Sequence, residues 1–245
     1  VHVYCVFHQI IFHTHAIENL MSSSSTHRLA TVDENTIRRI AAMVAMARND
    51  PKLELEARIG QFTDGRFVAG VSRSHMDTII QSLENCKDVS SINQAWKEEE
   101  NYIYTHDGIR MRTRVTFDSE SGQASCSTIT KTTLESLMLT TRALDVRIAL
   151  CKENVVQEQS VPFAVDTSHV RIKQVKNYKV HRSPFRIDCS SVWSGTHRSI
   201  AERHQSTENA VYEVECELDL HRPDSEWKER YPTDSRVVRS LLFKL

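Results

Sequence analysis

The sequence lacks several features that define common classes of protein. Its 245 residues include only six glycines and five prolines, and no stretch rich in either divides the chain. No apolar run approaches the ~18 residues of a membrane-spanning helix, so we expect no association with a membrane. None of the six cysteines forms a CxxC pair, which argues against a structural zinc site. A net charge of −1 is unlike the basic excess of general nucleic-acid-binding proteins.

The N-terminal segment differs from the rest of the chain. Residues 1–20 hold four of the twelve histidines, at irregular spacing, and have neither a basic start nor a small-residue cleavage site. Met21 and four serines follow. We therefore expect residues 1–20 to be an extension without function, and residues 21–245 to form a single domain.

Most of the chain shows the period-two alternation that is typical of strands. His106-Asp107-Gly108 predicts a hairpin turn, and Ser119–Gln123 predicts another. Eight strands are predicted, over residues 52–60, 100–105, 108–117, 124–133, 143–152, 169–178, 184–193 and 210–220.

Helical spacing is confined to three segments. An amphipathic helix is predicted over residues 32–49, with a capping box of Thr31 and Glu34, and a second over residues 74–86. A short C-terminal helix is expected over residues 237–245. The predicted fold class is therefore mainly β (α+β), an antiparallel β domain with helices packed outside it.

Two predicted strands, near opposite ends of this domain, carry acidic faces. In "VYEVECELDL", Glu213, Glu215 and Glu217 alternate with apolar residues, and in "KLELEARIG", Glu54 and Glu56 do the same. Carboxylates in such a row repel one another unless a cation neutralises them. Either these are solvated outer faces, or the two strands face each other and hold a divalent cation. Carboxylate oxygen is the ligand that Mg²⁺ or Mn²⁺ prefers.

The strands between them repeat this pattern with basic residues. Taken alone, each basic face is consistent with a solvated surface. Together they favour a closed β-barrel with charged side chains inside and apolar side chains outside. Such an interior suits a metal-bound, linear anion such as a triphosphate, although the chain has no GxxxxGK[ST] loop. The residues on these faces are Arg110, Arg112, Arg114, Lys131, Arg147, Glu153, Arg171, Lys173, Arg186, Asp188 and Ser190.

The two acidic motifs resemble the glutamate motifs of the triphosphate tunnel metalloenzymes. "ELEARIG" and "YEVECELDL", with basic strands between them, are most similar to the metal-dependent RNA 5′-triphosphatases of fungi, protozoa and some large viruses. The similarity extends over residues 50–222 or so. It implies a closed antiparallel eight-stranded barrel, the triphosphate tunnel, and removal of the γ-phosphate of nascent RNA as the first step of cap formation.

The same resemblance implies a cofactor, partners and a location. The cofactor is Mg²⁺ or Mn²⁺, and the partners are the 5′-triphosphate end of RNA and an RNA guanylyltransferase. The proposed role implies a nuclear location. No oligomeric state is predicted.

The resemblance also assigns roles to individual residues. Arg58 replaces a lysine common in the family, and Val175 stands where a third basic residue often continues the Arg171 and Lys173 clamp. The metal-binding residues are Glu54, Glu56, Glu213, Glu215 and Glu217. The catalytic residues are Glu153, which orients water, with Arg112, Arg186 and Asp188. The substrate-binding residues are Arg58, Arg110, Arg171, Lys173 and Ser190, to which the charged faces add Lys131 and Arg147.

Two other functions remain open. Arg58 after the first acidic pair leaves room for a tunnel enzyme that acts on inorganic, nucleoside or thiamine triphosphate. A non-catalytic RNA-binding β-barrel with exposed charged faces would bind RNA in a salt-sensitive way without metal.

Overall fold

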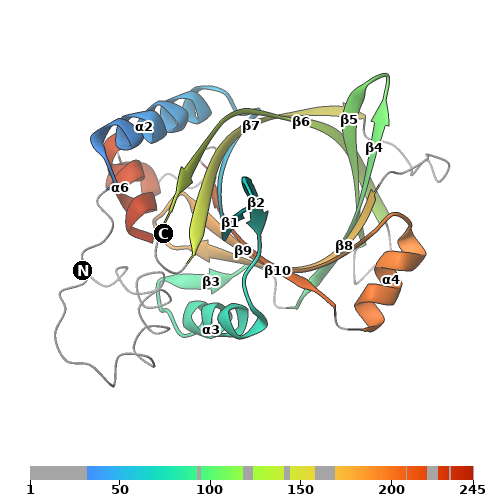
Figure 1. Ribbon diagram of the computed structural model, residues 1–245. Helices are drawn as coiled ribbons and strands as arrows, with labels where there is room; N and C mark the ends of the chain where they lie inside the picture. Colours follow the sequence, from blue (N-terminus) through green and yellow to red (C-terminus); the bar gives the residue numbers. More distant parts are fainter. Residues whose placement is uncertain are drawn as a thin grey trace.

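The computed structural model describes residues 32–92, 95–117, 124–140, 144–157, 169–207, 209–219, 226–231 and 233–244. Within these ranges all strands belong to one antiparallel sheet, and pairing of its first and last long strands closes a barrel (Figure 1). The order around the barrel is β10-β9-β8-β4-β5-β6-β7-β1. The strands are β1 (Leu53–Thr63), β2 (Arg66–Ala69), β3 (Val89–Ser91), β4 (Lys97–His106), β5 (Ile109–Phe117), β6 (Ala124–Leu139), β7 (Asp145–Gln157), β8 (His169–Val180), β9 (Phe185–Gly195) and β10 (Val211–Leu218).

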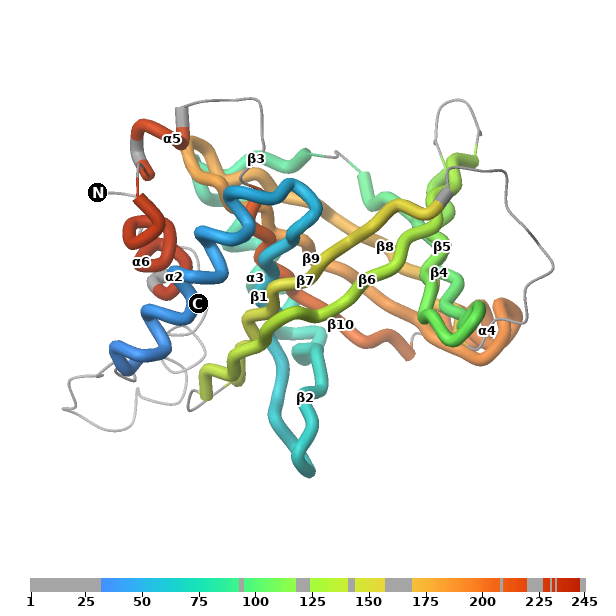
Figure 2. Tube along the Cα trace, turned by 90° about the horizontal axis from the view of Figure 1, so that it is seen from above, coloured from blue at the N-terminus to red at the C-terminus, as the bar shows by residue number. Residues whose placement is uncertain are grey.

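The predicted fold class is confirmed, since all eight predicted strands form the barrel. Asp107 and Gly108 have φ of 50° and 75°, the left-handed geometry expected of the predicted hairpin turn. Strands β2 and β3 were not predicted. Asp64-Gly65 makes the same kind of turn between β1 and β2, and Figure 2 shows that this hairpin projects beyond the barrel.

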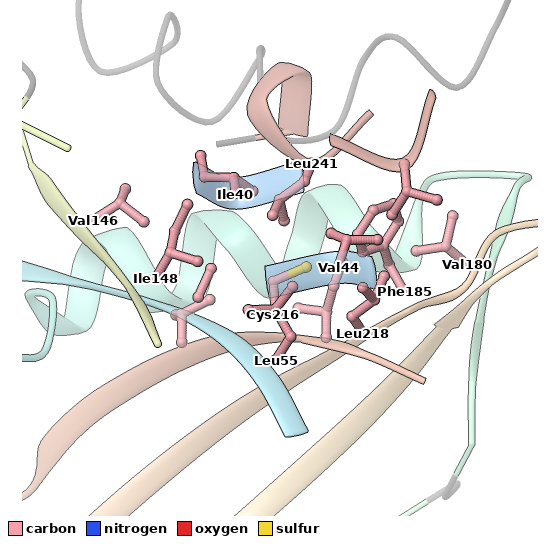
Figure 3. Packing of buried hydrophobic residues seen from close by; sticks show 14 of the residues in the cluster. Ile40, Val44, Leu55, Val146, Ile148, Val180, Phe185, Cys216, Leu218 and Leu241 are labelled. Atoms are coloured by element: carbon pink, nitrogen blue, oxygen red, sulfur yellow. The ribbon is translucent and has the colours of Figure 1, made fainter. Parts of the chain in front are cut away.

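Helices pack on the outside of the barrel, where the apolar faces of the strands lie. Helices α2, α3 and α6 share one large core with the outer faces of β1, β7, β9 and β10, and α4 packs on β8 and β9. Figure 3 shows the packing of this core, with Ile40 and Leu241 on helices above strand residues such as Ile148. The helices are α2 (Glu34–Asn49), α3 (Arg73–Glu84), α4 (Arg198–Ser206), α5 (Glu226–Arg230) and α6 (Asp234–Lys244).

Three details differ from the sequence-based expectations. The N-cap of α2 is Asp33, whose carboxylate accepts from the Thr36 amide at 3.0 Å, so the predicted capping box was wrong. The C-terminal helix starts earlier than predicted and packs against α2. Helix α4 was not predicted. Residues 1–20 and the turn at 119–123 lie outside the described ranges.

A bulge in strand β6 changes which of its residues face the interior of the barrel and which face the outer core. Up to Thr133 its odd-numbered residues face the interior, as Lys131 does opposite Glu153. The register shifts between Thr133 and Glu135, and beyond this point odd-numbered Leu137 belongs to the outer core. One extra residue in a strand pair has this effect because side chains alternate faces with a period of two.

None of the helices described is long and apolar enough to cross a membrane.

Candidate active site

The barrel encloses a cavity of about 800 Å³ that is lined mainly by charged side chains. The cavity lies on the inner face of the strands, opposite the apolar core. It therefore has the inside-out arrangement that the alternating sequence predicted. Of the candidate residues, those that line it are Glu54, Glu56, Arg58, Arg112, Lys131, Glu153, Arg171, Lys173, Arg186, Asp188, Glu215 and Glu217.

The acidic wall, formed by Glu54, Glu56, Glu215 and Glu217, joins the two predicted acidic strands. Pairing of β1 with β10 sets Glu56 directly opposite Glu217 and sets Arg58 opposite Glu215. Glu56 is almost fully buried, at 3% exposure. Four carboxylates on two adjacent strands therefore face the same small volume.

The electrostatics of this wall indicate a shortage of positive charge near Glu217. Burial, together with the nearby Glu54 and Asp188 carboxylates, raises the pKa of Glu217 to about 8, although Arg186 opposes this. By contrast, Arg58 and other cations hold the pKa of Glu215 down at about 2, although burial opposes them. Glu217 therefore keeps a proton at neutral pH that a closer cation would displace.

Lys131 is the cation at the centre of the acidic residues. Its Nζ lies 2.5 Å from Glu54, 3.1 Å from Glu56 and 3.3 Å from Glu153. Burial by itself would lower the pKa of Lys131, but Glu56 and Glu54 raise it above its ordinary value. Among the described residues, no three acidic, histidine or cysteine side chains are grouped as a ready metal site. The ammonium group occupies the middle of the carboxylates instead.

Glu153 connects the acidic residues to the arginines. Arg112 donates to its carboxylate at 3.0 Å. Burial raises the pKa of Glu153, but Lys131, a hydrogen bond with Glu54 and Arg112 together lower it below its ordinary value. Glu153 is thus ionised at neutral pH and can accept a hydrogen bond from water.

The basic wall, formed by Arg112, Arg114, Arg171 and Lys173, lies on β5 and β8, and each of its cations has a carboxylate within 3.8 Å, with Glu99 shared by Arg114 and Lys173. Burial lowers the pKa of Arg112, and the neighbouring Arg114 lowers it further. The buried Nε atoms of both arginines have no hydrogen-bond partner. Lys173 is 3.7 Å from Glu99, too far for a strong hydrogen bond. This wall would gain most from an anion with several oxygens.

Arg186 and Asp188, on β9, lie beside the acidic wall. Arg186 contacts the Asp188 carboxylate at 3.1 Å and pairs with Glu217 across to β10. Asp188 also accepts from Asn177 at 2.6 Å. The pair therefore links the acidic wall to the β8 side of the cavity.

Two predicted basic residues do not line the cavity. Arg110 is exposed at the end of the β4–β5 hairpin, so its predicted position inside the barrel was wrong. Arg147 pairs with Arg58 across β1 and β7 and shares its inward phase, 3.7 Å from Glu56 and with its guanidinium 5.2 Å from the Phe67 ring centroid. It can therefore support Glu56, although it does not line the cavity.

Ser190 and Glu213 also lie outside the cavity lining, in the packed interior of the barrel. The two residues pair across β9 and β10, and Ser190 is fully buried. Glu213 is 2.6 Å from Arg171. The structure therefore gives Glu213 an arginine partner rather than a position among the other acidic residues.

Sequence reasoning missed several cavity residues on β4 and β5. The predicted strand began at residue 100, whereas β4 begins at Lys97, and so Glu99 was overlooked. Extending the odd-numbered face of "KEEENYIY" back by three residues would have found Lys97, Glu99 and Asn101 together. Arg114 was recognised on the same face as Arg112 but was given no role.

A closed eight-stranded barrel with an acidic wall and a basic wall inside defines the chain as a triphosphate tunnel protein. The chain belongs to the mRNA triphosphatase family, described as the mRNA capping enzyme, beta chain, whose family model matches residues 66–238. It is accordingly an RNA 5′-triphosphatase, a hydrolase of mRNA capping, and the resemblance drawn from the sequence is confirmed. The match begins after Glu54 and Glu56 and therefore does not cover the first acidic motif.

Solved structures share this fold. The S. pombe RNA triphosphatase Pct1 is 15% identical with a TM-score of 0.59, over 90% of this chain and 94% of that chain. A structure of Pct1 in complex with the Spt5 CTD is 16% identical with a TM-score of 0.58, and the match covers 86% of this chain and 90% of that chain. The mimivirus capping enzyme triphosphatase is 14% identical with a TM-score of 0.52, and the match covers 86% of this chain and 98% of that chain. A search of curated proteins finds no match to the sequence.

Proposed function

We propose that this RNA 5′-triphosphatase is metal-dependent and removes the γ-phosphate of nascent RNA inside the barrel. The observation that supports this most is the combination of a protonated carboxylate and incompletely bonded arginines in one cavity. The pKa of Glu217 is raised to about 8 although Arg186 pairs with it, and the buried Nε atoms of Arg112 and Arg114 have no hydrogen-bond partner. A divalent metal bound to a triphosphate would place further positive charge beside Glu217 and oxygen acceptors beside the arginines.

The residues present fit such a metal. Glu54, Glu56 and Glu217 would hold it, with Glu215 near them, because carboxylate oxygens are the ligands that Mg²⁺ and Mn²⁺ prefer. The position of the Lys131 ammonium group, within 3.3 Å of three carboxylates, indicates where positive charge is stabilised. When bound, the metal would neutralise phosphate charge and polarise the γ-phosphoryl group.

The remaining chemistry is assigned to the chain's own side chains. Arg112 and Arg114 would bind the phosphate oxygens, with Arg171 and Lys173 beyond them, and would stabilise negative charge that develops during transfer. Glu153, ionised and 3.0 Å from Arg112, would accept a hydrogen bond from water and orient it for in-line attack. Arg186 would hold Asp188 and Glu217 in place.

The RNA product of this reaction is the substrate of another capping enzyme. Removal of the γ-phosphate leaves a 5′-diphosphate end, which an RNA guanylyltransferase uses. We infer that the protein works with such an enzyme on nascent transcripts, and therefore in the nucleus of a cell that has one.

The test is phosphate release from RNA that carries a γ-labelled 5′-triphosphate. Release is expected with Mg²⁺ or Mn²⁺ and not with EDTA. Glu54→Ala and Glu217→Ala should each abolish it while circular dichroism shows a folded protein. Full activity in EDTA, or in either folded variant, would overturn the metal assignment.

The same assay separates the two alternative functions. A tunnel enzyme specific for small triphosphates would release phosphate from tripolyphosphate or a nucleoside triphosphate but not from RNA. A non-catalytic RNA-binding barrel would release none and would bind RNA without metal.

A further inference from the structure

The cavity reaches one end of the barrel. Its lining includes the starts of β1 and β4, the end of β7 and the end of β10. In an antiparallel barrel these termini lie at the same end. The lining residues at this end include Lys52, Ile92, Lys97 and Val155, which are all exposed. A long substrate can therefore enter the cavity here.

The open end differs in chemistry from the rest of the cavity. We define the rim as Lys52, Ile92, Lys97, Asn154 and Val155, all of which line the cavity at this end of the barrel. Ile92 and Val155 are exposed by 56% and 65%, although both face a cavity that is otherwise charged. The hydrogen bond from the Ile92 amide to Asn177 extends the wall of β8 and holds Ile92 there.

The apolar side chains of the rim would make no favourable contact with an inorganic triphosphate, which has no apolar group. Val155 lies two residues beyond Glu153 on the same face of β7, about 7 Å closer to the opening. A triphosphate held by Arg112 would thus direct the group attached to its α-phosphate toward Val155. The only apolar parts of a triphosphate-ended RNA are its bases and riboses.

We propose that the rim binds the first nucleoside of the RNA, and that this contact favours triphosphate-ended RNA over short triphosphates. Ile92 and Val155 contact the base or ribose, and the exposed Lys52 and Lys97 are placed for the next backbone phosphate. The apolar contacts carry no hydrogen-bond code, so the rim accepts any base. This inference rests on the proposed function, because it assumes that the triphosphate lies in the same cavity.

The experiment compares Val155→Ser with Val156→Ser. Val156 is the next residue of β7, is exposed by 51%, and does not line the cavity, so it is a matched control. Both residues are exposed, and both variants should fold. For each protein kcat/KM is measured with triphosphate-ended RNA and with tripolyphosphate.

The ratio of the two kcat/KM values decides the proposal. Val155→Ser should lower the ratio of RNA to tripolyphosphate by about threefold to tenfold, mainly through the KM for RNA, as expected for lost apolar contact. Val156→Ser should leave the ratio at the wild-type value. An unchanged ratio in Val155→Ser, or an equal fall in both variants, would overturn the proposal.

A binding measurement keeps this result separate from the proposed function. If the wild type released phosphate from neither substrate, the proposed function would be wrong. Fluorescence anisotropy with labelled triphosphate-ended RNA would then still test the rim. Val155→Ser must weaken binding relative to Val156→Ser, and equal binding by the two variants would reject the rim as the nucleoside site.

Discussion

Replacing Lys131 by glutamine should make the stability of the protein strongly dependent on metal. The ammonium group lies within 3.3 Å of Glu54, Glu56 and Glu153, and its side chain is only 20% exposed. Removing one partner of a buried ion pair costs about 3–5 kcal/mol, and the lower value suits a cavity that water can enter. For a chain of this size ~3 kcal/mol lowers Tm by roughly 6–12 °C.

Mg²⁺ should restore most of this loss, because a metal among the carboxylates replaces the missing ammonium charge. Tm is measured in EDTA and in saturating Mg²⁺ for the wild type, for Lys131→Gln and for Lys152→Gln. Lys152 is a suitable control, since it follows Cys151 on β7 and does not line the cavity. We expect a clearly larger Mg²⁺-induced rise in Tm for Lys131→Gln than for the other two. Equal rises in all three proteins would refute the reasoning that Lys131 and the metal share one site.

The following predictions test other parts of the structure. Burial and Glu54 raise the pKa of Glu217 from 4.5 to about 8, so Mg²⁺ must displace a proton below that pH. Calorimetry should find Mg²⁺ affinity rising with pH up to about 8; a pH-independent affinity would contradict this. The same proton contributes stability that is complete below pH 4.5 and is lost as the pH rises through about 8, which denaturation in EDTA can follow. Arg112→Ala should lower kcat/KM by about 10²–10³, whereas Arg110→Ala, outside the cavity, should stay near the wild type. Burial raises the pKa of Cys189 to about 12, so a thiol reagent should modify Cys86 and Cys126 in the native protein well before Cys189, as peptide mass spectrometry would show. Ile148→Ala should destabilise the fully buried outer core by about 2–5 kcal/mol without changing kcat well below Tm, and a large loss of kcat would mean that the core and the cavity are coupled.

The barrel itself could be predicted because its strands alternate strictly. In residues 53–58 of β1 and 212–217 of β10 each apolar or aromatic residue is followed by a charged one, so one face had to be buried against helices and the other had to be polar. The closure of the barrel could not be derived from alternation alone, since it depends on the pairing of β1 with β10 across the whole chain. The β1–β2 hairpin was missed although Asp64-Gly65 is a clear turn signal.

Site residues could be predicted where the alternation of side chains along a regular strand is enough to show which of them face the interior. Glu54 and Glu217 lie inside because their strands are regular. Arg110 shares the phase of Arg112 but lies at the hairpin, where the wall ends, and the sequence does not show how long the wall is. The partners of each charge could not be predicted either. That Arg171 pairs with Glu213, for instance, depends on β9 lying between β8 and β10 in the sheet.

The bulge in β6 makes the orientation of the strand's side chains depend on one surface residue. Leu134 is 47% exposed, and its side chain contributes little to the core. The presence of its backbone is nevertheless what allows Lys131 to face inward while Leu137 faces outward on the same strand. A substitution at Leu134 should therefore be tolerated, whereas its deletion would exchange the two faces of half a strand. At this position the number of residues carries more structural information than their identity.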